Sequence, residues 1–350
     1  MACFTASNAI AKSHLLLSTS KLDCLLCVFI GTCHGDARRH KLNSAKVWLW
    51  SEKHTPRVMG GKSSSSPPPP PPLLDKPWLQ MEWGGRDTDL QFINNYTPKA
   101  DGLQQFRILL HGPVGAGKSS FINSVISSLE GKICHRAVVC NTGQSGFTKE
   151  YKTYRIQTGN QQNMSPLVLN DMMGLGNVNR RHRRVHVKDV KKAMKGRIKD
   201  GYKFNPESSL SETDQFYNKT PNVNDKVHVL VSVIDADKVN LLSDNVVEII
   251  QDIRDDATDL GIPHVAILTK IDEACPEIKK DVKNLCKSRL LQKRVKDISK
   301  KVGIPENCIF PVKNYHSERN VDNDIDALVL NTLRCIIEIG DEYLKIQERI

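Results

Sequence analysis

The sequence LLHGPVGAGKSSF at residues 109–121 decides the fold class of this chain. It contains the pattern G-x-x-x-x-G-K-S between an apolar run at 106–110 and a helical pattern at 120–129. Glycines in such a loop let the backbone turn tightly and point its N–H groups at phosphate oxygens, the lysine reaches the β- and γ-phosphates, and the serine hydroxyl binds Mg²⁺. The stretch therefore predicts a phosphate-binding P-loop. Its predicted phosphate-binding residues are Gly112, Pro113, Val114, Gly115, Ala116, Gly117, Lys118, Ser119 and Ser120.

A second motif indicates which base the site reads. The run VAILTKID at residues 265–272 predicts a buried strand that ends in T-K-x-D, about 150 residues after the P-loop. In this pattern the Asp272 carboxylate accepts hydrogen bonds from the two N–H donors on the edge of guanine, and the aliphatic part of Lys270 packs over the base. Adenine presents the wrong donors, and a site built for hydrogen bonds rejects a ligand that leaves them unpaired. We therefore expect Thr269, Lys270 and Asp272 to bind guanine.

A third motif lies between the other two. The run PLVLNDMMG at residues 166–174 predicts a strand ending in D-x-x-G, in which Asp171 holds Mg²⁺ through water and the Gly174 N–H senses the γ-phosphate. A switch threonine should also close on the metal. We favour Thr148 over Thr142, because Thr148 stands just ahead of the strand predicted at 152–158. The predicted metal-binding residues are Ser119, Asp171 and Thr148.

The run CIFPVKN at residues 308–314 reads as a short buried strand followed by a turn. In guanine-nucleotide folds the corresponding loop donates a backbone N–H to guanine O6. We expect Val312 to be this donor, with Lys313 beside it in the base-binding loop.

One position departs from the pattern of small GTPases. These proteins follow D-x-x-G with a glutamine that orients the attacking water, whereas Gly174 is followed here by Leu175. An apolar side chain cannot position water. We therefore expect slow GTP hydrolysis, unless the insert described below, a partner protein or a second copy of the chain supplies the missing group.

These residues together resemble the interferon-induced protein 44 family, including its 44-like members. The resemblance rests on HGPVGAGKSSFINSV (111–125), DMMGL (171–175), GYKFNP (201–206), VLVSVIDAD (229–237) and PVKNY (311–315), and it covers the chain from about residue 77 to the C-terminus. It implies a P-loop GTPase-like domain, GTP binding, a cytoplasmic location, and a role in immune response and antiviral defence. Longer members carry an N-terminal TLDc domain, and we expect this chain to be a short form without it.

The rest of the sequence favours an α/β fold. Strand-like runs at 106–110, 153–158, 166–170, 227–234, 264–268 and 308–312 alternate with helix-like runs at 119–129, 187–200, 243–260, 277–302 and 324–347. Such alternation predicts a mostly parallel sheet with helices on both faces. The ten cysteines show no disulfide or metal-binding spacing, which favours a reducing cytosolic compartment.

The N-terminal third predicts no globular core. We expect residues 1–58 to be a disordered upstream extension of doubtful origin, 59–76 to be a Ser/Pro-rich linker, 77–105 to pack on the nucleotide domain, and 106–350 to form that domain. The linker contains six consecutive prolines at 67–72, typical of a polyproline II spacer. The sequence MGGKSS at 59–64 fits an N-myristoylation signal if translation begins at Met59.

A basic insert is expected at 177–226. Residues Arg180 to Lys203 hold eleven Lys or Arg against two Asp, a local net charge of +9 in a chain whose net charge is +11. Such a patch suits an anionic membrane, RNA or an acidic protein partner. No nucleic-acid motif favours RNA.

Two functional hypotheses follow. The chain is a GTP- and GDP-binding, Mg²⁺-dependent switch that hydrolyses GTP slowly or assembles by self-association, or it is a scaffold that holds nucleotide without turnover. An adenine-specific P-loop ATPase is the remaining alternative.

Overall fold

The computed structural model describes residues 70–139, 150–158, 163–176 and 179–347. The upstream extension at 1–58, the first part of the linker and the switch segment with Thr142 and Thr148 lie outside the described residues.

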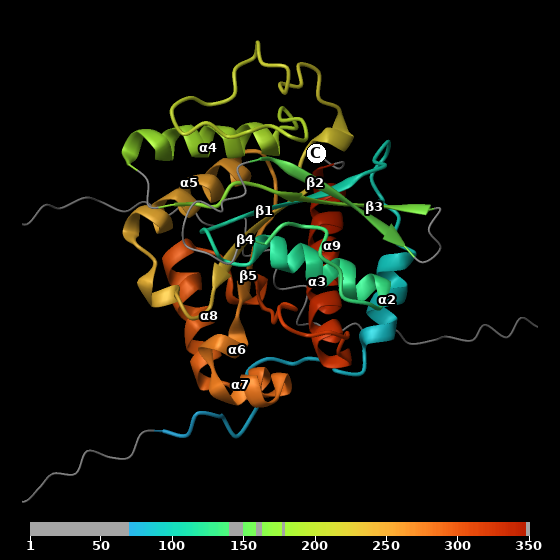
Figure 1. The fold of residues 1–350 in the computed structure, drawn as a ribbon, viewed down its shortest axis with the longest axis vertical. Helices are drawn as coiled ribbons and strands as arrows, with labels where there is room; N and C mark the ends of the chain where they lie inside the picture. Colours follow the sequence, from blue (N-terminus) through green and yellow to red (C-terminus); the bar gives the residue numbers. More distant parts are fainter. Residues whose placement is uncertain (1–69, 140–149, 159–162, 177–178, 348–350) are drawn as a thin grey trace, which may run out of the picture. The chain divides into compact units, whose positions relative to one another are not determined.

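A six-stranded sheet forms the centre of the fold, in the strand order β2-β3-β1-β4-β5-β6 (Figure 1). The strands are β1 (Phe106–His111), β2 (Lys152–Thr158), β3 (Asn163–Asp171), β4 (Val229–Asp235), β5 (His264–Thr269) and β6 (Ile309–Pro311). Only β2, at one edge, runs antiparallel to its neighbour. Every residue of β4 is buried, as expected for a parallel strand covered on both faces. The predicted mostly parallel α/β fold is confirmed.

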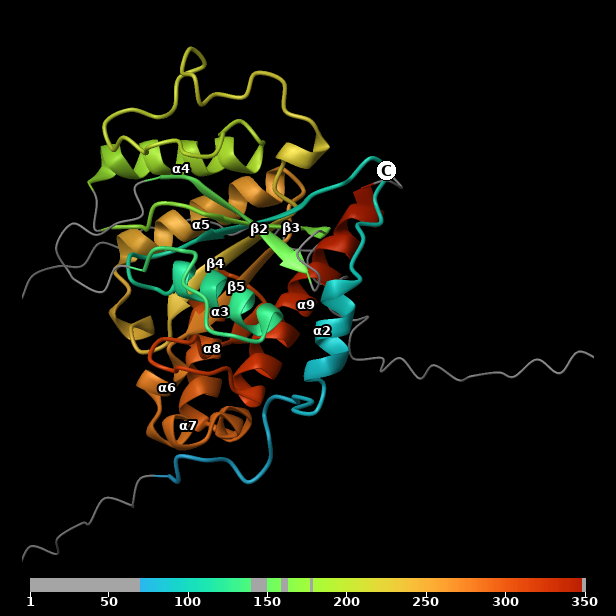
Figure 2. The same cartoon turned by 45° about the vertical axis from the view of Figure 1, so that its right-hand side comes forward.

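Helices cover both faces of this sheet. The longer ones are α2 (Arg86–Asn94), α3 (Lys118–Glu130), α4 (Arg180–Met194), α5 (Asp244–Asp259), α8 (Arg289–Val302) and α9 (Asn323–Gln347). Short helical segments are η2 (Val223–Asp225), η3 (Val239–Leu241), α6 (Ile271–Ala274), α7 (Pro276–Lys280), η4 (Val282–Lys287) and η5 (Glu306–Cys308). One face carries α3 and α9, with α2 packed along α9, and the other carries α4, α5 and α8 (Figures 1 and 2).

The strand register brings the sequence motifs to one edge of the sheet. Leu110 of β1 pairs with Asp171 of β3, and Asp235 of β4 pairs with Thr269 of β5. Because these strands are parallel, the residues that follow them emerge at the same edge. Ligands of open α/β sheets bind at this carboxyl edge.

Two predicted helices differ from the observed ones. The helix expected at 187–200 begins earlier, at Arg180, because the Asn179 side chain caps it by accepting from the His182 N–H. It ends at Met194, two residues before Gly196 adopts a left-handed conformation with φ of 71°. The helix expected at 277–302 is divided into α7, η4 and α8, because the Asp281 and Ser288 side chains cap η4 and α8 at their N-termini.

Helix α2 was not expected from the sequence. It binds α9 through polar contacts that its weak apolar pattern does not reveal: the Asp89 carboxylate lies 2.9 Å from Arg334 Nη1, and the Tyr96 hydroxyl after the helix donates to Asp341 at 2.7 Å. Contacts with the rest of the domain begin before residue 77, since the Leu74 N–H donates to the Lys287 carbonyl. The Trp78 indole N–H donates to the Leu285 carbonyl at 2.9 Å.

Candidate nucleotide-binding site

The P-loop joins β1 to α3 through three glycines with positive φ. At Gly112, with φ of 139°, an added Cβ would collide with the carbonyl of Val233 on the neighbouring strand. Gly117 caps α3 with φ of 95°, and an added Cβ would lie 3.1 Å from Asn314 Nδ2. These two glycines let the loop pass close to the sheet and wrap around the N-terminus of α3. Ser120 lies in the first turn of the helix, where free backbone N–H groups favour an anion.

Lys118 is buried inside the loop. Its ammonium donates to the carbonyls of Gly112 at 3.0 Å and Pro113 at 3.1 Å. Burial lowers the pKa of Lys118, and the negative charge of Asp171 acts in the opposite direction. The lysine is therefore held in place within the loop, where a phosphate would bind.

Ser119 and Asp171 meet as the metal prediction requires. The Ser119 hydroxyl donates to Asp171 Oδ2 at 2.6 Å. Asp171 Oδ1 is buried and has no hydrogen-bond partner among the described residues. Burial raises the pKa of Asp171, although Lys118 and Ser119 oppose that rise. A hydroxyl and a carboxylate with a spare oxygen fit Mg²⁺, which prefers oxygen ligands and keeps several of its waters.

The D-x-x-G segment is joined to the P-loop by backbone hydrogen bonds. The Val114 N–H donates to the Leu175 carbonyl at 3.0 Å, and the Leu175 N–H donates to the Gly112 carbonyl at 2.9 Å. Gly174 lies against Val114 so closely that an added Cβ would be 2.8 Å from Val114 Cγ2. The predicted γ-phosphate sensor thus lies directly beside the phosphate loop.

The T-K-x-D motif lies on the other side of the same loop. The Thr269 hydroxyl donates to the carbonyl of Ala116 in the P-loop at 2.5 Å. Lys270 adopts a left-handed conformation, with φ of 55°, and its ammonium lies 3.0 Å from Asp235 Oδ2. Asp272 follows in the first turn of α6, and its carboxylate has no hydrogen-bond or ion-pair partner among the described residues. It is therefore available to accept from a ligand.

The expectation for Val312 is corrected by the structure. Its N–H donates to the Leu268 carbonyl at 2.8 Å, extending the β5–β6 pairing, and its side chain is fully buried. The amide is thus used by the sheet and is not free for guanine O6. Lys313 follows it, and its ammonium lies 3.1 Å from Glu318 Oε1. This leaves the backbone of Lys313 as the first candidate donor in the loop.

Sequence reasoning missed Asn314 and Asp235. Asn314 Nδ2 donates to the Gly117 carbonyl at 3.3 Å, and its buried Oδ1 has no hydrogen-bond partner among the described residues. Asp235 holds the Lys270 ammonium. Asp235 ends a buried strand and Asn314 follows one, both at the carboxyl edge of the sheet. That position is the only feature of the sequence that indicates a role for them in the site.

A buried polar cluster lies directly behind the P-loop. The Ser232 hydroxyl is 2.7 Å from His111 Nε2 and 2.8 Å from His264 Nε2. Burial lowers the pKa of His264 to about 3 and that of His111 well below its usual value. Both imidazoles are therefore neutral at physiological pH.

The charge of the basic insert is partly neutralised within the fold. On α4, Arg183 pairs with Glu248 and with Asp252 of α5, and Lys191 pairs with Asp256. Arg180, Arg184 and Lys188 of α4 remain exposed. The surface open to a membrane, RNA or protein is thus less basic than the composition of 180–203 indicates. Within the described ranges, none of the helices combines the length and the apolar composition that a bilayer-spanning helix needs.

The fold and the three converging motifs define the chain as a protein with a P-loop, GTPase-like domain. It is 32% identical over 260 residues to interferon-induced protein 44 of Pan troglodytes and of Homo sapiens, covering 74% of this chain and 58% of each relative. Interferon-induced protein 44-like of Homo sapiens is 31% identical over 260 residues, or 57% of its length. The chain belongs to the interferon-induced protein 44 family, as its motifs predicted, and spans less than two thirds of these relatives.

Similar solved structures are more distant. Toc33 from Arabidopsis thaliana in complex with GDP and Mg²⁺ is 15% identical, with a TM-score of 0.42, covering 74% of this chain and 96% of that one. A probable GTP-binding protein engB is 16% identical, with a TM-score of 0.36, covering 67% of this chain and 98% of that one. No family model matches the chain.

Proposed function

We propose that this chain binds GTP and GDP with Mg²⁺, and that it acts in the cytoplasm as part of the interferon-induced immune and antiviral response. One observation carries the nucleotide part of the proposal. The Thr269 hydroxyl binds the Ala116 carbonyl at 2.5 Å and so ties the base-reading motif to the phosphate loop, while the Asp272 carboxylate beyond it has no partner among the described residues.

Each end of the nucleotide has residues suited to it. Lys118 and the P-loop N–H groups would bind the phosphates, and Ser119 and Asp171 would hold Mg²⁺, the aspartate through water. The ion, when bound, neutralises charge on the β- and γ-phosphate oxygens. Asp272 would accept from the guanine edge, and the Lys313 N–H replaces Val312 as the proposed donor to O6.

Nucleotide choice tests this proposal. Full-length protein is titrated with a fluorescent GDP analogue and competed with GTP, GDP, ATP and ADP in the presence of Mg²⁺. GTP and GDP should displace the analogue at concentrations at least about a hundredfold below ATP, because adenine leaves the half-buried Asp272 carboxylate unpaired. Equal competition by ATP and GTP would replace the guanine assignment with an adenine-specific ATPase.

The scaffold alternative is favoured by Leu175. Its side chain is only 4% exposed and lies in a mostly apolar pocket with Phe204 and Ile249, so this position supplies no group that orients water. We therefore propose slow hydrolysis or none by the isolated chain. Single-turnover hydrolysis of γ-labelled GTP distinguishes the two cases when it is repeated over a range of protein concentrations. A rate that rises with protein concentration indicates catalysis completed by self-association, and a rate at background throughout indicates a scaffold.

The cellular part of the proposal needs its own test. Cells that lack the protein are given either the wild-type chain or Lys118→Ala, expressed at equal levels, and are then infected. Wild type should lower virus yield more than the variant, and the protein should be found in the cytoplasm. Equal protection by both would separate the antiviral role from nucleotide binding.

A further inference from the structure

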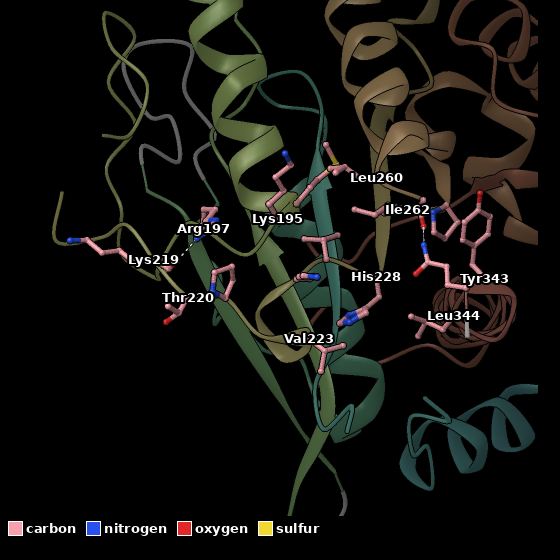
Figure 3. Close-up of a pocket in the computed structure, with 17 residues that line it drawn as sticks. Lys195, Arg197, Lys219, Thr220, Val223, His228, Leu260, Ile262, Tyr343 and Leu344 are labelled. Atoms are coloured by element: carbon pink, nitrogen blue, oxygen red, sulfur yellow. Dashed lines mark hydrogen bonds between the residues drawn. The ribbon is translucent and has the colours of Figure 1, made fainter. Parts of the chain in front are cut away.

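A second cavity lies at the opposite edge of the sheet from the nucleotide site. Its volume is about 620 Å³, within the usual range of small-molecule sites. It lies among the C-terminal end of α4, the segments 219–228 and 260–263 that lead into β4 and β5, and the C-terminal part of α9 (Figure 3). The proposed nucleotide function does not use this cavity.

The charges around the cavity are all of one sign. Lys195, Arg197, Lys219 and Lys226 line it, and no aspartate or glutamate does. None of these four side chains makes an ion pair within the described part of the chain. On the same insert Arg183 and Lys191 are neutralised by carboxylates of α5. A concave surface lined by unpaired cations focuses a positive potential and attracts an anion.

Arg197 is held in position at this cavity. One of its terminal nitrogens donates to the carbonyls of Asn218, at 3.2 Å, and of Lys219. Its guanidinium carbon also lies 5.7 Å from the centre of the Tyr217 ring. Since a guanidinium has five N–H donors, others remain free to bind an anion from a fixed position.

The wall beside these cations is mostly apolar, and the His228 ring is set into it. Leu260, Ile262, Tyr343 and Leu344 line this side, and the His228 ring lies between them and Val223 (Figure 3). His228 is 5% exposed, and its Nδ1 accepts the Arg107 N–H at 2.8 Å. The neutral ring therefore carries its proton on Nε2. The backbone of Val223 interacts with this N–H and raises the pKa of His228, against the larger effect of burial.

We propose that this cavity binds a small anionic amphipathic molecule, with its carboxylate or phosphate head on the Lys195, Arg197, Lys219 and Lys226 side and its apolar part against Ile262 and Leu344. Inorganic phosphate alone would satisfy the cations but leave the apolar wall empty. A neutral apolar molecule would fill the wall but leave the cations unpaired. The cavity therefore fits a molecule that carries both an anionic group and an apolar part.

The test uses two dyes with the same aromatic frame. 1-Anilinonaphthalene-8-sulfonate carries an anionic group, and N-phenyl-1-naphthylamine does not. Full-length protein saturated with GDP and Mg²⁺ is titrated with each dye, so that the nucleotide site is occupied. We expect saturable binding of one sulfonate dye per chain and weaker binding of the neutral dye by about tenfold or more, the value of roughly one charge-assisted contact. Decanoate should displace the sulfonate dye, whereas decanol and inorganic phosphate should not do so at equal concentration.

Variants locate the binding. Lys219→Glu with Lys226→Glu should weaken sulfonate-dye binding at least about tenfold, since two attractive contacts become repulsive. The matched control is Arg184→Glu with Lys188→Glu, which makes the same charge change on the exposed face of α4 and should leave binding unchanged. Val223→Trp, at the partly exposed rim of the cavity, should block both dyes without changing charge.

Three results would contradict the proposal. Equal loss in the cavity and control pairs would show general charge attraction and overturn the proposal. Undiminished binding to Val223→Trp and to the Lys219/Lys226 pair, with both variants folded by circular dichroism, would also overturn it. Full displacement by inorganic phosphate at the decanoate concentration would contradict the amphipathic assignment.

Discussion

The backbone N–H of Val114 in the P-loop donates a hydrogen bond to the carbonyl of Leu175 at 3.0 Å. The Leu175 N–H returns a bond to Gly112, so that the D-x-x-G segment and the phosphate loop are paired like neighbouring strands. The Leu175 side chain, in turn, packs in an apolar pocket formed with the insert. The residue that replaces the usual glutamine therefore joins the phosphate loop to the insert.

Replacing Leu175 with glutamine should not restore efficient hydrolysis. The new amide would enter the apolar pocket and lower the free energy of unfolding by about 1–3 kcal/mol, the cost of a poorly satisfied buried polar group. Single-turnover GTP hydrolysis and urea unfolding measure the two effects. A rate increase on the order of a hundredfold, typical of a well-placed catalytic group, would show that this side chain reaches the attacking water and would contradict our assignment.

Asp272→Asn should shift the base preference of the site from guanine toward xanthine. Loss of the charged acceptor should weaken GDP binding by about 1.5–3 kcal/mol, the value of a hydrogen bond to a charged group. An amide at this position can donate to the C2 carbonyl of xanthine, so binding of xanthosine diphosphate should improve. Competition titrations with both diphosphates measure this. The control is Glu306→Gln, which removes an exposed carboxylate ahead of β6 and should not affect either nucleotide.

Lys118→Ala and Ser119→Ala should each lower affinity for GTP with Mg²⁺ by a few kcal/mol, on the order of a charge-assisted contact. The serine variant should lose most of its dependence on Mg²⁺, since its hydroxyl is a predicted metal ligand. Calorimetric titration with and without Mg²⁺ distinguishes the two variants. Lys132→Ala, which removes an exposed lysine beyond α3, is the control. Wild-type affinity in both site variants would overturn the P-loop assignment.

Stability should fall in mild acid because of the buried histidines. Burial lowers the pKa of His186 to about 4 and that of His228 to about 4, whereas unfolding returns them to about 6.5. In mild acid the unfolded state then binds more protons than the folded state. The contribution of these histidines to the free energy of unfolding is therefore fully present above about pH 6.5 and is lost as the pH falls toward 4. His186 alone should account for about 2–3 kcal/mol between pH 6.5 and 4.5.

Urea unfolding at these two pH values, compared between wild type and His186→Leu, isolates that contribution. The variant should lose less stability in acid, and leucine suits the apolar pocket that His186 lines. His135→Gln removes an exposed histidine and should keep the wild-type dependence. Identical pH dependence in wild type and His186→Leu would show that His186 is not held neutral by burial.

Local residue order was enough to predict the class of fold and the loop between β1 and α3. Gly112, Gly117, Lys118 and Ser119 lie within one turn between adjacent elements, so their spacing in the chain fixes their arrangement in space. The parallel sheet followed from alternating apolar runs, because a strand buried on both faces and a helix buried on one differ in period. The ends of β3 near Asp171 and of β5 at Thr269 followed from the same patterns.

Only the tertiary structure decided which of these groups are free to act. The position of Val312 at the end of a short strand predicts a free N–H, yet this N–H donates to the Leu268 carbonyl, and strand pairing is a relation between distant segments. The basic composition of 180–203 gave no sign that α5 places carboxylates against Arg183 and Lys191. The cavity beside His228 is likewise lined by segments from α4 to α9. These segments are far apart in the sequence, and only folding brings them around one space. Sequence determines contacts close along the chain, whereas hydrogen-bond partners and net local charge depend on residues that only folding brings together.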